Sequence, residues 1–239
     1  MAKVVLVTGG SRGIGKAVSK KFAAEGYLVA VNFEKSEEKA KALAKEIGGK
    51  AYCADVSDYG AVCRMFDDIE KGLGEVEVLI NNAAISTFGL FQDCTDDEWE
   101  RIFGVNVKGV FNCSKRAISN MVKNHSGSIV NISSIWGVTG GSCECHYSAT
   151  KAAVIGYTKA MAKELGPSGI RVNCIAPGAV DTEMNARFTK EDLEAVAEES
   201  ALGYIAKPEE IAEAVFFAAS EKASYMTGAV INVNGGSVI

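Results

Sequence analysis

The chain has 239 residues, of which 48% are hydrophobic and 23% charged. That balance is ordinary for a folded globular protein and excludes an intrinsically disordered one. The formal net charge of −5 argues against nucleic-acid binding as the main role, and no apolar run approaches the length of a membrane span. Because no linker, repeat or low-complexity tract divides the sequence, we expect one domain over residues 1–239.

The seven cysteines are scattered and contain no Cys-x-x-Cys pair, a usage typical of proteins in a reducing compartment. We therefore expect a cytoplasmic location. One cluster, Cys143-Glu144-Cys145-His146, could contribute to a metal site only with a fourth ligand and more separation than adjacent residues give. We expect no metal site here and interpret these residues as loop side chains beside a substrate pocket.

The N-terminus reads as strand, glycine-rich turn and helix. Residues 3–8 are a short apolar run without alternation, which is typical of a strand buried on both faces. The turn that follows allows close approach of a pyrophosphate, and the N-terminus of the next helix supplies amide donors. Its spacing differs from the usual G-x-G-x-x-G, and a purely structural turn is the alternative. The candidate phosphate-binding residues are Gly9, Ser11, Arg12, Gly13, Ile14 and Gly15.

A second buried strand is expected over residues 27–33 and ends in Phe33, followed by Glu34, Lys35 and Ser36. An acid at this place binds the free 2′-hydroxyl of NAD, whereas basic residues accept the 2′-phosphate of NADP. Lys35, Ser36 and Arg12 favour NADP, and Glu34 opposes it. The sequence therefore predicts NADP(H) in preference to NAD(H).

Strands and helices continue to alternate along the chain. We expect further strands at residues 51–54, 76–80, 128–131, 170–176 and 229–233, and helices at 36–47, 58–71, from 95 towards 122, around Tyr147, and from Pro208. Ser36 is expected to cap its helix, and Thr95 with Glu98 forms a capping box. The pattern predicts an α/β fold, a doubly wound parallel sheet of Rossmann type with about seven strands and helices on both faces.

Ligands bind beyond the carboxyl ends of the strands in such sheets. Five residues, Gly9, Asp55, Asn82, Ser134 and Pro177, stand at or just after the ends of predicted strands and should meet at that edge. Residues 181–203 interrupt the alternation with an acidic helical stretch. It is either a lid over the pocket or a plain surface helical pair.

Tyr147 and Lys151 are one helical turn apart, so their side chains share a helix face. A neighbouring ammonium favours the phenolate, so we expect Lys151 to lower the pKa of Tyr147. Tyr147 could then exchange a proton with a carbonyl or alcohol oxygen that the Ser134 hydroxyl also holds. The alternative is that the tyrosine merely packs and the lysine is solvated.

These residues together resemble the short-chain dehydrogenase/reductase family over nearly the whole chain. The matching motifs are Thr8-Gly9-x-x-x-Gly13-x-Gly15, Asn81-Asn82-Ala83, Asn106, Ser134, Tyr147-x-x-x-Lys151 and Pro177-Gly178. Ala84 departs from the glycine usual after Asn-Asn-Ala.

The resemblance implies a role for each matching residue. Tyr147 would be the general acid, Ser134 would orient the carbonyl, and Asn106 would hold a water of the proton relay. Lys151 would bind the nicotinamide ribose. The other implied cofactor-binding residues are Asp55 and Val56 at the adenine, Asn82 and Ala83, Pro177 and Gly178, and Val180 and Thr182 near the nicotinamide amide and the phosphates.

Within that family the chain is most similar to bacterial 3-oxoacyl-[acyl-carrier-protein] reductases, in residues 109–122, 164–178, 208–220 and 225–236. This implies NADPH-dependent reduction of 3-oxoacyl thioesters, an acyl carrier protein as partner, and a homotetramer. Such enzymes commonly carry basic residues that contact the acidic carrier protein. At the matching places this chain has His125, Ser168 and Tyr204, and the nearest cations are Lys123 and Arg116. Two alternatives stay open: a dehydrogenase or carbonyl reductase for steroids, sugars or small ketones, and a non-catalytic dinucleotide sensor.

Overall fold

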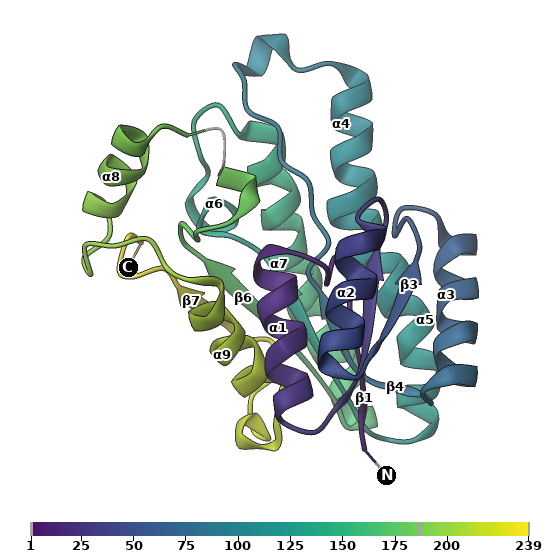
Figure 1. Ribbon diagram of the computed structural model, residues 1–239. Coiled ribbons are helices and arrows are strands. Elements are labelled where there is room, and N and C mark those ends of the chain that lie inside the picture. The colour runs from purple at the N-terminus through teal and green to yellow at the C-terminus, as the bar shows by residue number, and fades with distance from the viewer. Residues whose placement is uncertain (1, 186–187, 239) are drawn as a thin grey trace.

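The computed structural model describes residues 2–185 and 188–238. Its centre is one sheet of seven parallel strands in the order β3-β2-β1-β4-β5-β6-β7 (Figure 1). The strands are β1 Val4–Val7, β2 Leu28–Phe33, β3 Lys50–Cys53, β4 Val76–Asn81, β5 Gly127–Ile132, β6 Ile170–Pro177 and β7 Val230–Val233. The predicted doubly wound parallel sheet is confirmed.

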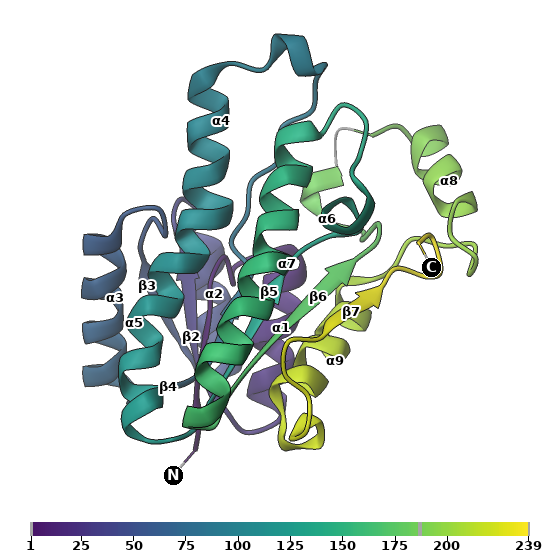
Figure 2. The same ribbon diagram turned by 180° about the vertical axis from the view of Figure 1, so that it is seen from behind.

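Helices cover both faces of the sheet (Figures 1 and 2). One layer holds α1 Gly13–Ala24, α2 Glu37–Ile47 and α9 Pro208–Ala219, and the other holds α3 Tyr59–Gly72, α5 Gly109–Lys123 and α7 Cys145–Leu165. Successive side chains of a strand point to opposite faces, so Val4 and Leu6 pack into one core cluster and Val5 and Val7 into the other. This two-sided burial explains why the strands are continuous apolar runs.

The helix ends follow local side-chain chemistry. Helix α4, Asp96–Phe103, begins with the predicted capping box, in which Glu98 N donates to Thr95 Oγ1 at 3.2 Å. Ser36 stands at the N-cap position of α2 but makes no side-chain capping bond, so that expectation is wrong. The acidic Glu37 and Glu38 in the first turn interact favourably with the positive end of the helix dipole.

Strand β1 lies between β2 and β4, so the chain winds outward in one direction to β3 and in the other to β7. The crevice at this reversal, beyond the carboxyl ends of the strands, is where such sheets bind ligands. Helix α4 stands above that edge on one side and α8, Lys190–Glu198, on the other (Figures 1 and 2).

Shorter elements complete the chain. The five-residue helix α6 spans Ile135–Thr139, a π-helical turn, η2, spans Gly104–Lys108, and 3₁₀ turns occur at η1 Phe91–Asp93, η3 Gly166–Ser168, η4 Glu183–Asn185 and η5 Glu221–Ala223. The stretch expected to be helical over 181–203 is therefore η4 followed by α8, and residues 186–187 lie outside the described residues. Among the described helices, none combines the length and apolar character needed to cross a bilayer.

Candidate active site

A cavity of about 610 Å³ opens at the carboxyl edge of the sheet. It is lined by every predicted cofactor residue, namely Gly9, Ser11, Arg12, Gly13, Ile14, Gly15, Phe33, Lys35, Ser36, Asp55, Val56, Asn82, Ala83, Pro177, Gly178, Val180 and Thr182. Ser134, Tyr147 and Lys151 line it as well. Residues distant in the sequence thus meet in one site because parallel strands end at one edge.

The glycine turn requires its glycines. Gly9 and Gly13 have φ of +60° and +51°, a region that side chains rarely adopt. A Cβ on Gly15 would overlap the carbonyl oxygen of Gly9 and lie 2.6 Å from Asn82 Nδ2. The turn therefore presents bare backbone to the cavity beside the start of α1, as a pyrophosphate site needs.

Asn82 braces this turn from the neighbouring strand end. Its Nδ2 donates to the carbonyl oxygens of Thr8 at 2.9 Å and Gly9 at 3.2 Å, while Thr8 Oγ1 accepts from Asn82 N at 2.9 Å. Asn32 was not identified from the sequence, yet its Oδ1 accepts from Gly9 N at 3.1 Å and its Nδ2 donates to Ala54 O at 3.1 Å. An asparagine within an otherwise apolar buried strand was the available signal.

Tyr147, Ser134 and Lys151 meet where β5 passes into α6 and α7. Ser134 is the N-cap of α6, with its Oγ accepting from Trp136 N at 3.2 Å, and it lines the cavity together with Tyr147. Lys151 Nζ lies 5.5 Å from the centre of the Tyr147 ring and donates to Ile132 O at 2.8 Å. The alternative in which the lysine is solvated is excluded, since Lys151 is 3% exposed.

Burial controls the ionisation of this pair. It raises the pKa of Tyr147 above its usual value, Glu144 raises it further, and the nearby Ser134 hydroxyl lowers it without reversing the shift. Burial also lowers the pKa of Lys151 to about 8. The expectation that Lys151 lowers the pKa of Tyr147 is therefore wrong, because desolvation of the phenolate outweighs an ammonium that is directed to Ile132 O.

Asn106 lies behind the cavity wall in the π-helical turn between α4 and α5, and it does not line the cavity. Its Oδ1 accepts from Ile85 N and its Nδ2 donates to Ile85 O, both at 2.9 Å, with a further bond to Thr150 Oγ1 at 3.1 Å. Asn106 thus links the loop after β4 to the helix of Tyr147. π-Helical turns inside helices are frequent at functional sites.

An ion-pair network surrounds the end of β2. Arg101 of α4 donates to Asp55 Oδ2 at 2.8 Å and to Glu34 Oε1 at 3.1 Å, and Lys35 Nζ lies 3.8 Å from the same Glu34 oxygen. Burial opposes ionisation of Asp55, but bonds from Ser57 and Arg101 outweigh it and lower its pKa. Arg101 was missed because it belongs to a helix without a cofactor motif.

With this geometry in place, the chain can be compared with known proteins. A family model described as enoyl-(acyl carrier protein) reductase, a short-chain dehydrogenase/reductase type, matches residues 9–237. The chain belongs to the short-chain dehydrogenase/reductase family. It is accordingly an NAD(P)-dependent oxidoreductase that acts on carbonyl or hydroxyl groups.

Similar members of the family match over 99% of this chain and 98% of their own length. They are 3-oxoacyl-[acyl-carrier-protein] reductase FabG of Staphylococcus aureus, 42% identical over 241 residues, and of Thermotoga maritima, 39% over 242 residues. Acetoacetyl-CoA reductase of Rhizobium meliloti is 42% identical over 237 residues. The chain is thus similar to reductases named for two different thioester carriers.

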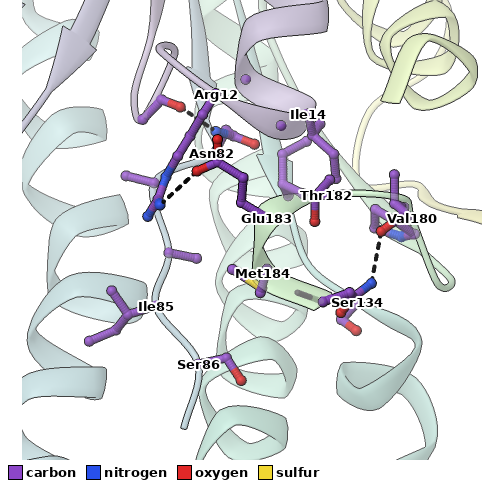
Figure 3. A pocket seen from close by; sticks show the side chains of 18 of the residues that line it. Arg12, Ile14, Asn82, Ile85, Ser86, Ser134, Val180, Thr182, Glu183 and Met184 are labelled. Atoms are coloured by element: carbon purple, nitrogen blue, oxygen red, sulfur yellow. Dashed lines mark hydrogen bonds and ion pairs between the residues drawn. The ribbon is translucent and has the colours of Figure 1, made fainter. Parts of the chain in front are cut away.

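In this short-chain dehydrogenase/reductase the segment after β6 forms one wall of the cavity. Met184, Phe188, Leu193 and Val196 line it. The Phe188 ring also meets the ring of Phe88, from the loop after β4, edge to face with centroids 6.2 Å apart. Figure 3 shows Thr182, Glu183 and Met184 beside Ile14 and Ser134. The segment after β6 therefore contributes apolar side chains to the cavity.

The cysteine cluster before Tyr147 contributes differently. His146 is 4% exposed and its Nε2 is hydrogen-bonded to Thr87 Oγ1, while Cys145 is exposed. Within residues 2–185 and 188–238, no group of three His, Cys, Asp or Glu side chains is arranged to hold a metal ion. Gly89 N donates to Cys143 O at 3.0 Å, so the cluster ties together the two loops beside the cavity.

Proposed function

We propose that this enzyme uses NADPH to reduce 3-oxoacyl thioesters to 3-hydroxyacyl products, as a 3-oxoacyl-[acyl-carrier-protein] reductase of fatty-acid synthesis. The observation that carries the proposal is the meeting of Ser134, Tyr147 and Lys151 in a cavity that Met184, Phe188, Leu193 and Val196 also line. The full-length similarity to reductases of that name supports the substrate class.

The residues present fit a nicotinamide dinucleotide. The bare glycine turn fits the pyrophosphate, since a Cβ on Gly15 would fill it. Asp55 and Val56 would border the adenine, Lys151 would bind the nicotinamide ribose, and the carboxamide end would meet Pro177, Gly178, Val180 and Thr182. When bound, the reduced dinucleotide supplies the hydride that is transferred to the carbonyl carbon.

The protein supplies the proton. Tyr147 is protonated at neutral pH because its pKa is raised, so it can donate its phenolic proton to the carbonyl oxygen as the carbonyl carbon accepts the hydride. Ser134 Oγ holds that oxygen in place. Asn106 would connect the phenol to solvent through a water, and its bonds to Ile85 would at the same time fix the substrate loop.

The preference for NADPH rests on charges at the end of β2. Glu34, the acid that opposes a 2′-phosphate, is bound by Arg101 and neighbours Lys35, which reduces its repulsion. Arg12, Lys35 and Ser36 line the cavity together with Glu34. Replacing Arg12 and Lys35 by glutamine should raise the KM for NADPH more than that for NADH.

Two molecules are candidates for the carrier of the acyl group: acyl carrier protein and coenzyme A. The similarity to an acetoacetyl-CoA reductase favours coenzyme A as a second carrier beside acyl carrier protein. Arg116, one of the nearest cations to the expected carrier surface, is bound by Asp67 and Glu70 and has a side chain only 17% exposed. These carboxylates weaken its attraction for an acidic carrier.

The remaining parts of the proposal come from the family. We propose a cytoplasmic homotetramer with a single domain over 1–239, whose segment 181–203 closes over the substrate. Neither a nucleic acid nor a membrane is a proposed partner. A sedimentation measurement that gives a monomer at the assay concentration would contradict the proposed homotetramer.

The function is tested by incubating the purified enzyme with NADPH or NADH and following loss of absorbance of the reduced nicotinamide. The substrate arms are acetoacetyl-acyl carrier protein, acetoacetyl-CoA, a steroid ketone, a keto sugar and a small ketone. Turnover of the thioesters with NADPH, at least tenfold faster than the other ketones, supports the proposal. Faster turnover of a non-thioester ketone contradicts it.

A further inference from the structure

Arg12 and Glu183 line both the cavity and a second hollow beside it. A third basic side chain, Lys39, which no sequence motif indicates, lines that hollow together with Arg12. Glu183 of η4 lies between them: its Oε2 is 3.4 Å from Arg12 Nη1 and its Oε1 is 2.5 Å from Lys39 Nζ of α2. Figure 3 marks the Arg12–Glu183 ion pair with a dashed line. One carboxylate thus joins the glycine turn, α2 and the segment after β6.

The position of Glu183 is fixed by its neighbours. Thr182 packs against Gly13, where a Cβ would lie 3.3 Å from Thr182 Cγ2. Asn185 Nδ2 donates to Val180 O at 2.8 Å, which closes the turn around η4. The carboxylate is therefore presented to the basic side chains by a braced turn.

Arg12 is one of the residues expected to contact the 2′-phosphate, and it lines the cavity as well as the hollow that Lys39 lines. Lys39 is three residues after Ser36, which lines the cavity at the start of α2. Hydrogen bonding from Lys39, with a smaller contribution from Arg12, lowers the pKa of Glu183, so the group is a carboxylate at neutral pH. Arg12 and Lys39 are two cations held around one carboxylate, and a phosphate monoester could be bound by the same two cations.

The Glu183 carboxylate can also be displaced from Arg12 and Lys39. The side chains of Glu183, Arg12 and Lys39 are 52–57% exposed, and exposed ion pairs contribute little to stability. A phosphate with up to two negative charges attracts the same cations more strongly than one carboxylate does.

We propose that Glu183 is an internal counter-ion at the 2′-phosphate subsite, which NADPH must displace from Arg12 and Lys39. Lys39 then becomes a determinant of the preference for NADPH, and occupation of the subsite moves the Glu183 side chain away from both cations. This inference rests on the NADPH preference under the proposed function.

The test measures dissociation constants of the full-length protein for NADPH and NADH by nicotinamide fluorescence, without substrate. Glu183→Gln removes the competing charge and should tighten NADPH about three- to tenfold while changing NADH less than twofold. Lys39→Gln should weaken NADPH by a similar factor and leave NADH unchanged. Glu37→Gln is the matched control, because Glu37 is an exposed acid of α2 paired with Lys41; its NADPH/NADH ratio should equal that of the wild type.

The double variant separates a counter-ion from a structural contact. With Lys39 replaced, the gain from Glu183→Gln should shrink, because part of that gain is the release of Lys39. Weaker NADPH binding by Glu183→Gln, or equal changes for both nucleotides, would overturn the proposal. If the wild type binds NADH better than NADPH, the cofactor preference of the proposed function fails instead, whereas the thioester assay reports on the substrate independently.

Discussion

Replacing Lys151 by methionine should stabilise the protein at neutral pH while destroying its function. The side chain is 3% exposed, and burial lowers the pKa of its ammonium from 10.5 to about 8. The folded protein therefore holds a charge in a place that disfavours it. Methionine has a similar volume and no charge, so it removes this cost without opening a large cavity.

The magnitude follows from the pKa shift. A depression of this size corresponds to about 3 kcal/mol at pH values below 8. The variant also loses the bond from Lys151 Nζ to Ile132 O, which costs about 1–2 kcal/mol. The net expectation at pH 7 is a gain of about 1–2 kcal/mol in the free energy of unfolding.

The sign of the effect changes with pH. Between about pH 8 and 10.5 the unfolded chain binds more protons at this lysine than the folded protein does, so wild-type stability rises with pH relative to the variant. Near the upper end of that window only the lost hydrogen bond remains, and Lys151→Met should be the less stable protein.

The assay is urea unfolding at fixed protein concentration, without added nucleotide, at pH 6.5, 8 and 9.5. Lys159→Met on the exposed side of the same helix is the control, and its difference from wild type should not vary with pH. A variant less stable than wild type by a constant amount at all three pH values would refute the assignment of Lys151 as a buried, desolvated ammonium.

Two further substitutions test the site. Tyr147→Phe keeps the packed ring and removes the proton donor, so kcat should fall about 10²–10⁴-fold with little change in NADPH affinity, and a loss below tenfold would remove Tyr147 from its role. Gly15→Ala places a Cβ against the carbonyl oxygen of Gly9 and near Asn82 Nδ2, which should cost about 1–3 kcal/mol of stability and weaken nucleotide binding. Gly156→Ala, in open space on α7, is its control in thermal unfolding, and equal melting temperatures for the two would contradict the steric argument.

The strands and the strand-end residues were predictable from the sequence. Buried parallel strands appear as uninterrupted apolar runs, and the edge at which they end follows from their common direction. Gly9, Asp55, Asn82, Ser134 and Pro177 accordingly line one cavity. Helix capping was predicted less reliably, because the Thr95 side chain caps its helix and the Ser36 side chain does not.

Features that depend on side chains meeting across the fold were not predictable. Arg101 reaches Asp55 and Glu34 from α4, and Glu183 reaches Lys39 from a turn after β6. These partners lie far apart in the sequence, and no motif or regular spacing indicates that they meet. The direction of the Tyr147 pKa failed for a similar reason: proximity to Lys151 is visible in the sequence, whereas burial of both groups is a property of the assembled sheet and helices.

A buried polar ladder explains how the site keeps its alignment. Asn81 Nδ2 donates to Asn131 Oδ1 at 2.8 Å between paired positions of β4 and β5, and Asn131 Nδ2 donates to Thr158 Oγ1 of α7 at 2.9 Å. Asn82 comes directly after Asn81, and Ser134 comes three residues after Asn131. Lys151 lies two helical turns before Thr158.

A slip of one residue between β4 and β5 would leave these amides unpaired in the core, at a cost of about 1–3 kcal/mol for each group. It would also separate Asn82, which braces the glycine turn, from Ser134 and Tyr147. The polar groups that fix the strand register thus lie on the same elements, β4, β5 and α7, that position the groups that hold the cofactor and transfer the proton. Because both are set by the same pairing, an error in register would be penalised in stability as well as in catalysis.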